Sequence, residues 1–267
     1  MSMEAPHTGQ SSGTGQSKWR TLLMVGAIAP IVTIVLYLAE LSLIRWEQYP
    51  ETIEEWFRLF NESAPKALFY LNSLDMIAIG VLGVMFLALH VSLRETSPSL
   101  TIVATPFAFL GVGVFLVPRT ALLSLGGLSR AFEAAATAGD VGAAGEGGAA
   151  SAGAAPMAAE QAQLLAAGRA VSALGVPTLH TAGFFIVALA AVLVSIAMLR
   201  SAAFPRAVGI IGTGAFILTL VDVGALMIAP AVADTLLVVA GIAWVAWWVA
   251  VSWSLFRLAG RREQPST

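Results

Sequence analysis

A few polar side chains stand inside or beside long apolar runs, where ionisable groups are costly and often functional. They are Glu40, Asp75, Asp222, His180 and Asn72, the last lying one helical turn before Asp75. The spans assigned below place these residues at similar depth, toward the outer side of a membrane. We therefore hypothesise a water-filled outer vestibule, lined by carboxylates and a histidine, that could bind a cation or pass protons.

The same residues also have a structural interpretation. Asp75 and Asp222 could each anchor two helices by a hydrogen bond, because polar side chains hold membrane helices together. Glu40 lies near enough to a span end to be solvated, and His180 follows Pro177 where a capping or interfacial side chain is expected. A metal site of His180 with the two aspartates is possible by residue type, but no two of these three residues are spaced at i, i+3 or i, i+4, so we predict no metal site and no cofactor.

Three tryptophans form a second candidate site. Tryptophan normally gathers at membrane interfaces, but Trp244, Trp247 and Trp248 share one face near the middle of an apolar run. They could form an aromatic wall for a lipid tail, a hydrophobic substrate or an organic cation. Ordinary packing between helices would produce the same face, and the sequence leaves both interpretations open.

Familiar catalytic patterns are missing from the sequence. It has no Ser-His-Asp set, no HExxH and no Gly-x-Ser-x-Gly, and it has no cysteine to serve as a nucleophile or a thiolate ligand. We assign no catalytic residue, and an enzymatic function is not favoured.

Composition indicates that lipid is the solvent for most of the chain. Hydrophobic residues make up 58% of the 267 residues and charged residues only 11%, whereas a soluble domain carries about 25% charged residues. The net charge of −2 is too close to neutral to indicate nucleic acid as a partner. The partner implied by this composition is a lipid bilayer.

Six apolar runs are long enough to cross a bilayer, which takes about 20 residues. They predict an all-α, polytopic bundle of transmembrane helices, with short interfacial amphipathic helices in two outer loops. Polar tails at 1–17, expected to be disordered, and at 259–267 flank this membrane domain at 18–258. The predicted spans are 21–44, 67–91, 100–117, 178–199, 207–228 and 235–258.

The first outer loop contains a predicted amphipathic helix. Apolar residues at i, i+3, i+4 and i+7 from Ile53 to Phe60 form one helical face, and Thr52 with Glu55 has the spacing of a capping box. The helix could lie on the membrane surface or pack as a lid on the bundle, and both alternatives stay open.

The second outer loop follows Pro118 and Arg119, which we expect to close the third span. An amphipathic segment is predicted at 120–136. The stretch 137–156 is almost only alanine and glycine, so we expect a mobile loop there, and a helix resumes at 158–174.

Basic residues near span ends predict the orientation, because they gather on the cytoplasmic side. Six spans put both termini on one side, and the arginines and lysines there stand in short segments. We therefore expect both termini in the cytoplasm. The basic residues of this side are Lys18, Arg20, Arg94, Arg200, Arg206, Arg257, Arg261 and Arg262.

The turn between the fourth and fifth spans carries a motif made of Arg200, Phe204, Pro205 and Arg206. With the glycine-containing apolar run that follows, this cytoplasmic turn motif resembles the signature of the bacterial membrane family named domain of unknown function 4386. The resemblance covers 18–258 and implies a small multi-pass protein of the bacterial plasma membrane. That family has no assigned reaction or ligand, so the resemblance implies no catalytic residue.

These observations lead to three functional hypotheses. The first is a non-catalytic membrane component, either accessory, lipid-associated or stress-related, which could form a homo-oligomer or join a partner membrane protein. The alternative is a small transporter or a proton or cation permeation protein that uses the acidic vestibule. A membrane-embedded enzyme ranks third, because the sequence offers no nucleophile in a polar cluster.

Overall fold

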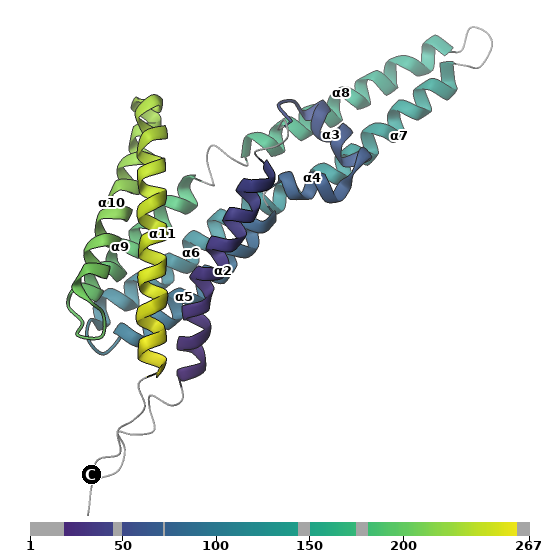
Figure 1. The fold of residues 1–267 in the computed structure, drawn as a ribbon. Helices are drawn as coiled ribbons and strands as arrows, with labels where there is room; N and C mark the ends of the chain where they lie inside the picture. Colours follow the sequence, from purple (N-terminus) through teal and green to yellow (C-terminus); the bar gives the residue numbers. More distant parts are fainter. Residues whose placement is uncertain (1–18, 45–49, 72, 144–149, 175–180, 261–267) are drawn as a thin grey trace, which may run out of the picture.

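The computed structural model describes residues 19–44, 50–71, 73–143, 150–174 and 181–260. All regular secondary structure in these ranges is helical, which confirms the predicted all-α fold. Figure 1 shows two parts, a bundle of long helices and a two-helix arm that extends away from it.

Six of the described helices are long and apolar enough to cross a membrane. Each combines strong helix formers with a nearly continuous apolar surface, as lipid requires of a segment whose backbone polar groups must all be satisfied internally. These helices are α2 (Arg20–Ile44), α5 (Ser73–Leu93), α6 (Pro98–Leu122), α9 (Thr181–Leu199), α10 (Arg206–Ile228) and α11 (Pro230–Gly260).

The six helices form a closed ring. Each packs against the next one along the chain, and α11 closes the ring by packing against α2 (Figure 1). We call this unit the helix ring. Its proximal end is the one where α2 begins at Arg20 and α11 ends at Gly260, and its distal end is where α5 begins at Ser73 and α6 ends at Leu122.

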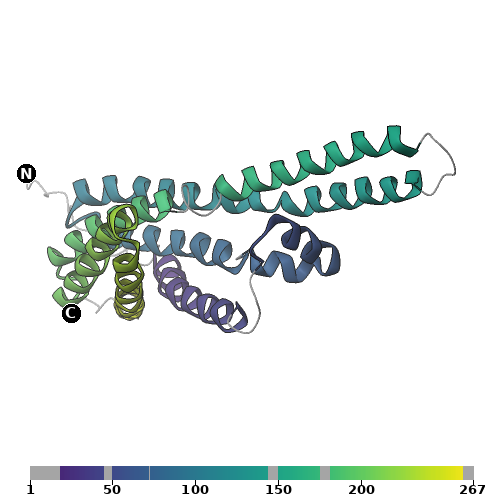
Figure 2. The ribbon, with the colours of Figure 1, turned by 90° about the horizontal axis from the view of Figure 1, so that it is seen from above.

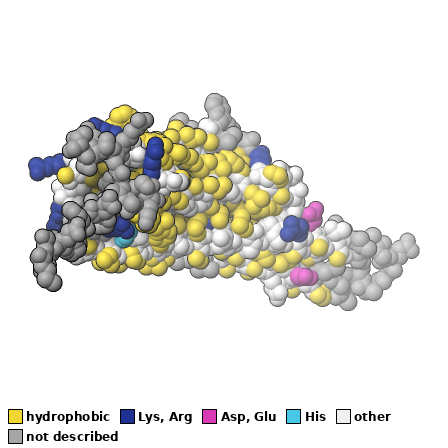
Figure 3. All heavy atoms as spheres, turned by 90° about the horizontal axis from the view of Figure 1, so that it is seen from below, with side chains coloured by type: hydrophobic (Ala, Val, Ile, Leu, Met, Phe, Trp, Pro, Cys, Tyr) yellow, Lys and Arg dark blue, Asp and Glu magenta, His cyan; other side chains and the backbone are white. Residues whose placement is uncertain are grey.

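The outer surface of the helix ring is apolar. Ile102, Val238 and Trp253 expose 64%, 64% and 65% of their surface, and hydrophobic side chains cover most of the ring's face in Figure 3. A soluble monomer rarely exposes such a large continuous apolar surface. The chain is therefore a multi-pass integral membrane protein.

Small residues bring α6 and α9 close together. A Cβ atom added at Gly111 would lie 2.7 Å from a methyl carbon of Val187, and one added at Gly183 would lie 2.8 Å from the backbone of Phe115. Small residues at a helix contact let the backbones approach closely in lipid. Any larger side chain at either glycine would push these two helices apart.

The third span is longer than the sequence predicts. Pro118 and Arg119 were expected to close it, but α6 continues through both residues to Leu122. A proline removes one backbone hydrogen bond without ending the helix when tertiary packing supports the next turn. That support comes from Arg119 and Leu122, which are both buried.

The second span is shorter than predicted. The stretch 67–91 was expected to be continuous, but α4 (Ala64–Tyr70) ends before α5 begins at Ser73. The Ser73 hydroxyl donates a hydrogen bond to the carbonyl of Leu68 and so satisfies an acceptor near the end of α4. Local capping by serine therefore competes with continuation of the helix.

The arm consists of α7 (Leu125–Ala143) and α8 (Ala150–Leu174), which pack side by side and extend beyond the helix ring (Figures 1 and 2). The expectation of a mobile loop at 137–156 is wrong for most of that stretch, since α7 continues to Ala143 and α8 begins at Ala150. Alanine has the highest helix propensity, and it outweighs the interspersed glycines. Residues 144–149 lie outside the described residues.

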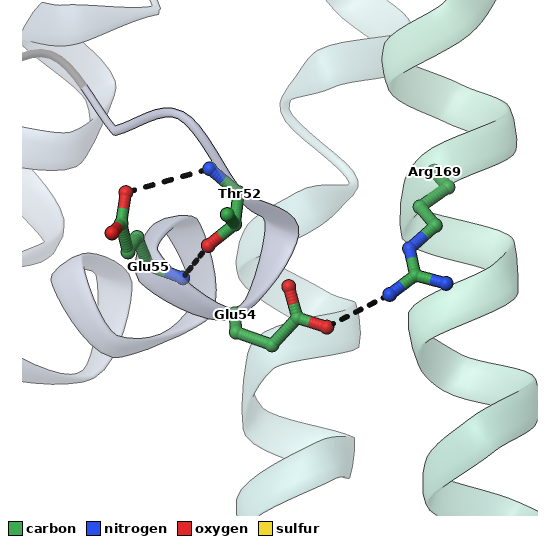
Figure 4. Close-up of polar contacts among 4 residues, drawn as sticks. All are labelled: Thr52, Glu54, Glu55 and Arg169. Atoms are coloured by element: carbon green, nitrogen blue, oxygen red, sulfur yellow. Dashed lines mark hydrogen bonds and ion pairs between the residues drawn. The ribbon is translucent and has the colours of Figure 1, made fainter.

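The predicted amphipathic helix of the first outer loop is α3 (Ile53–Glu62). Thr52 and Glu55 form the predicted capping box, and Glu54 forms an ion pair with Arg169 of α8 at 2.9 Å (Figure 4). The apolar face of α3 is buried against the arm rather than exposed to a membrane surface. Helix α3 therefore packs on protein, as the lid alternative expected, but the surface that it covers belongs mainly to the arm.

Candidate functional site

A buried ion pair joins two helices at the distal end. Asp75 stands in the first turn of α5 and Arg119 in the last turn of α6, with Nη2 of Arg119 3.1 Å from Oδ2 of Asp75. Both residues are only 5% exposed. The pairing is possible because α5 and α6 are adjacent and antiparallel, which brings residues 44 positions apart to the same depth.

Helix α2 adds two more polar side chains at this level. The Tyr37 side chain lies beside the Asp75 carboxylate and interacts with it electrostatically. Glu40, one turn further along α2 and 6% exposed, interacts electrostatically with both Asp75 and Arg119. We call Tyr37, Glu40, Asp75 and Arg119 the charged cluster. It brings side chains of α2, α5 and α6 together at the distal end, where the ion pair joins α5 to α6.

A small cavity lies inside the helix ring, next to the charged cluster, and we call it the aromatic cavity. Its volume is about 30 Å³, which is room for one or two water molecules. Five of the six ring helices contribute to its wall, and aromatic side chains dominate it. The aromatic residues of the wall are Tyr37, Phe86, Phe184, Phe216, Trp244, Trp247 and Trp248.

Close packing fixes two of these tryptophans. Trp247 is fully buried, and its Nε1 would lie 2.3 Å from a Cβ added at Gly212. Trp244 donates a hydrogen bond from Nε1 to Oγ1 of Thr219 on α10, at 2.9 Å. Thr219 also donates to the carbonyl of Ala215, so both polar groups of this pair are satisfied.

Side-chain contacts lead from the charged cluster into the wall of the aromatic cavity. Cζ of Arg119 lies 5.5 Å from the ring centroid of Phe115, one turn earlier on α6. Phe115 meets Phe184 of α9 edge to face, with centroids 5.2 Å apart. Phe184 in turn stacks on Trp244 of α11, with centroids 5.6 Å apart.

The contacts return to the charged cluster on the other side of the cavity. Trp244 contacts Trp248 with ring centroids 6.4 Å apart, and Trp248 stacks on Tyr37 at 6.0 Å. Tyr37 then completes the path through its electrostatic interaction with Asp75. The charged cluster and the cavity wall are thus one connected set of side chains that draws on α2, α5, α6, α9 and α11.

Asp75 and Asp222 have different surroundings. Asp222 lies on α10, one turn beyond Thr219, and is 5% exposed. Helix α10 packs against α9 and α11, whereas the groups that contact Asp75 come from α2 and α6. A vestibule lined by both aspartates stays a prediction.

The other predicted site residues are distributed along the molecule. Trp244, Trp247 and Trp248 all line the aromatic cavity, and Glu40 belongs to the charged cluster. Asn72 and His180 lie outside the described residues. In the turn motif between α9 and α10, Phe204 is buried, while Arg200, Pro205 and Arg206 are exposed.

Sequence reasoning missed Arg119 and Tyr37. Arg119 was expected to close the third span, because it follows a proline there, and so it was not among the candidate site residues. A usable signal was present, since an arginine inside a longer apolar stretch requires a carboxylate at the same depth, and Asp75 meets that condition. Tyr37 gave no comparable signal, because tyrosine is ordinary near a span end.

Within the described ranges, no group of three or more His, Asp or Glu side chains is placed to hold a metal ion. Comparisons with protein-family models, with curated proteins and with solved structures find no match to this chain. The resemblance to the domain of unknown function 4386 family therefore stays a prediction.

Proposed function

We propose that this chain is a non-catalytic component of a membrane, an accessory or lipid-associated protein whose charged cluster fastens the helix ring. The ion pair between Asp75 and Arg119 is the observation that carries this proposal. A guanidinium already pairs with this carboxylate, which is the arrangement expected of an anchor between helices rather than of a group awaiting substrate. The arm, which projects from the distal end, is the part best placed to meet a partner protein.

The aromatic cavity supports the same proposal. Thr219 and the tyrosine and tryptophan side chains supply the polar atoms of its wall, and among the residues that the structure describes no carboxylate, histidine, lysine or arginine lines it. A permeation path for protons or cations needs polar groups along its length. One observation favours permeation as the alternative function: Tyr37 belongs both to the charged cluster and to the cavity wall.

The location we propose is the bacterial plasma membrane, with both termini in the cytoplasm. Its support is the distribution of arginine among the span ends. Exposed arginines stand at most proximal span ends, whereas the one arginine at a distal span end within the described residues, Arg119, is buried against Asp75. This is the asymmetry that the positive-inside rule describes. The bacterial assignment rests on the family resemblance.

Flux measurements in liposomes separate the two functions. Purified protein is reconstituted with an internal pH-sensitive dye, and proton uptake is driven by a potassium gradient with valinomycin. We expect no uptake above that of protein-free liposomes, and a large loss of stability in Asp75→Asn. Proton flux that disappears in a stably folded Asp75→Asn protein, but not in Glu133→Gln on the arm, would favour permeation instead.

The orientation has its own test, made simple because the chain has no cysteine. Thr137→Cys places a thiol on the exposed arm, and Thr96→Cys places one at the exposed proximal turn between α5 and α6. A membrane-impermeant maleimide applied to intact cells should label the first variant and reach the second only after permeabilisation. The reverse labelling pattern would place the termini outside.

A further inference from the structure

The turn between α9 and α10 presents two arginines on a firmly held backbone. Phe204 is only 3% exposed and packs into the core of the helix ring, and the backbone N–H of Ala203 donates to Oγ of Ser201 at 3.2 Å. Arg200 and Arg206 flank this turn, and both are exposed. Burial of Phe204 therefore fixes the turn while the two guanidinium groups point away from the core.

Three more exposed arginines stand at the same end of the molecule. Arg20 begins α2, Arg94 follows the last residue of α5, and Arg257 lies in the last turn of α11. Cζ of Arg94 also lies 5.4 Å from the ring centroid of Trp19, which joins two of the helix ends. We call Arg20, Arg94, Arg200, Arg206 and Arg257 the basic collar. Figure 3 shows basic side chains gathered at this end of the molecule.

The basic collar lies at one depth. Each arginine is within three residues of the proximal end of an apolar span, so five of the six span ends at this side carry one. Among the described residues, Glu95 is the one carboxylate at this end. The guanidinium groups therefore form a strongly positive belt next to the apolar band, at the level that lipid phosphates occupy.

From this arrangement we infer that the basic collar binds the phosphate head groups of anionic phospholipids, with Arg200 and Arg206 as the principal contacts. A guanidinium group presents paired N–H donors that match a phosphate. The continuity of the collar with the apolar band selects a lipid, because a bound lipid can place its acyl chains against the band and its phosphate against the arginines. This inference rests on the lipid-associated role in the proposed function and gives it a ligand class, and its test by lipid titration is separate from the flux test of that function.

Lipid titration with the full-length protein tests the inference. Phosphatidylglycerol with a fluorescent acyl chain is titrated into protein in a neutral detergent, and fluorescence anisotropy gives the apparent dissociation constant. The same titration is made with phosphatidylcholine, with R200Q/R206Q, and with R130Q/R169Q as a matched control that removes two exposed arginines from the arm. Thermal unfolding in the neutral detergent establishes that each variant is folded.

We expect the wild type to prefer phosphatidylglycerol over phosphatidylcholine, and this preference to weaken with added salt. The R200Q/R206Q protein should bind phosphatidylglycerol roughly 30-fold more weakly, and R130Q/R169Q should match the wild type. If R200Q/R206Q does not fold, Arg20→Gln and Arg257→Gln should each weaken binding about fivefold.

Three results would overturn the inference. One is equal affinity of the wild type for the two lipids. Another is unchanged phosphatidylglycerol affinity in the collar variants. The third is complete displacement of the lipid by millimolar inorganic phosphate, because that result would indicate a site for the free ion rather than for a lipid.

Discussion

The two ends of the helix ring use arginine in opposite ways. At the distal end Arg119 is 5% exposed and paired with Asp75, whereas the five arginines of the basic collar at the proximal end are all exposed. The difference follows from depth. An arginine just outside the apolar band can reach water and lipid phosphates, but one turned inward among the helices needs a carboxylate partner. The same residue type is therefore structural at one end and available for contacts at the other.

The largest expected effect comes from breaking the buried pair. Arg119→Gln leaves the Asp75 carboxylate buried without its guanidinium, and loss of one partner of a buried pair costs roughly 3–5 kcal/mol. Unfolding by sodium dodecyl sulfate in mixed micelles, followed by tryptophan fluorescence, measures this loss. Arg130→Gln on the arm is the control, and equal stability of the two variants would remove the distinction between the ends.

A smaller loss is expected from the hydroxyl that joins α2 to the pair. Tyr37→Phe removes the hydroxyl beside Asp75 but keeps the ring that stacks on Trp248. Polar contacts between membrane helices are worth about 1 kcal/mol, so the same denaturant titration should show a loss no larger than that value. A loss as large as that of Arg119→Gln would mean that Tyr37, rather than Arg119, is the main partner of Asp75.

The arm carries an arginine that is paired, like Arg119, but exposed to solvent. Its removal therefore tests whether burial, rather than pairing alone, determines how much stability an ion pair contributes. Arg169→Gln removes the 2.9 Å contact with Glu54, whose side chain is 45% exposed against 65% for Arg169. Exposed ion pairs contribute little, so we expect a loss of about 0.5 kcal/mol. The double variant with Glu54→Gln measures the pairwise part, and a loss above that of Tyr37→Phe would show that exposure does not control the energetics.

At the proximal end, loss of charge should leave stability in neutral detergent unchanged. Arg200→Gln alters an exposed side chain for which the protein itself provides no carboxylate in the described contacts, and such substitutions have small effects. Thermal unfolding of this variant should superimpose on that of the wild type, and a clear downward shift would mean that the basic collar has a structural role.

Several features of the fold follow from local sequence. Apolar runs longer than a bilayer crossing indicate the ring helices, and the spacing of Thr52 and Glu55 predicts the capping box that the structure contains. These features are local, since hydropathy and capping depend on neighbours within a few residues. The alanine-rich arm was misjudged because glycine and alanine together were taken to indicate flexibility, whereas in the structure helix formation prevails up to Ala143 and from Ala150.

The candidate site was less predictable, because it depends on contacts distant in sequence. The sequence singles out Asp75 and the three cavity tryptophans, but it does not say which residue each one meets. Asp75 and Arg119 lie 44 positions apart, and their pairing requires that α5 and α6 be adjacent and that α6 continue past Pro118. The charged cluster and the aromatic cavity therefore emerge only once the ring is assembled.

The most direct test of this account is a double-mutant cycle of Asp75→Asn and Arg119→Gln, measured by unfolding in mixed micelles. If the pair fastens the helix ring, the double variant should lose much less stability than the sum of the two single losses, with an interaction energy of about 1.5–3 kcal/mol. Losses that add to within about 0.5 kcal/mol would show that the two side chains act independently, and that result would contradict a structural role for the pair.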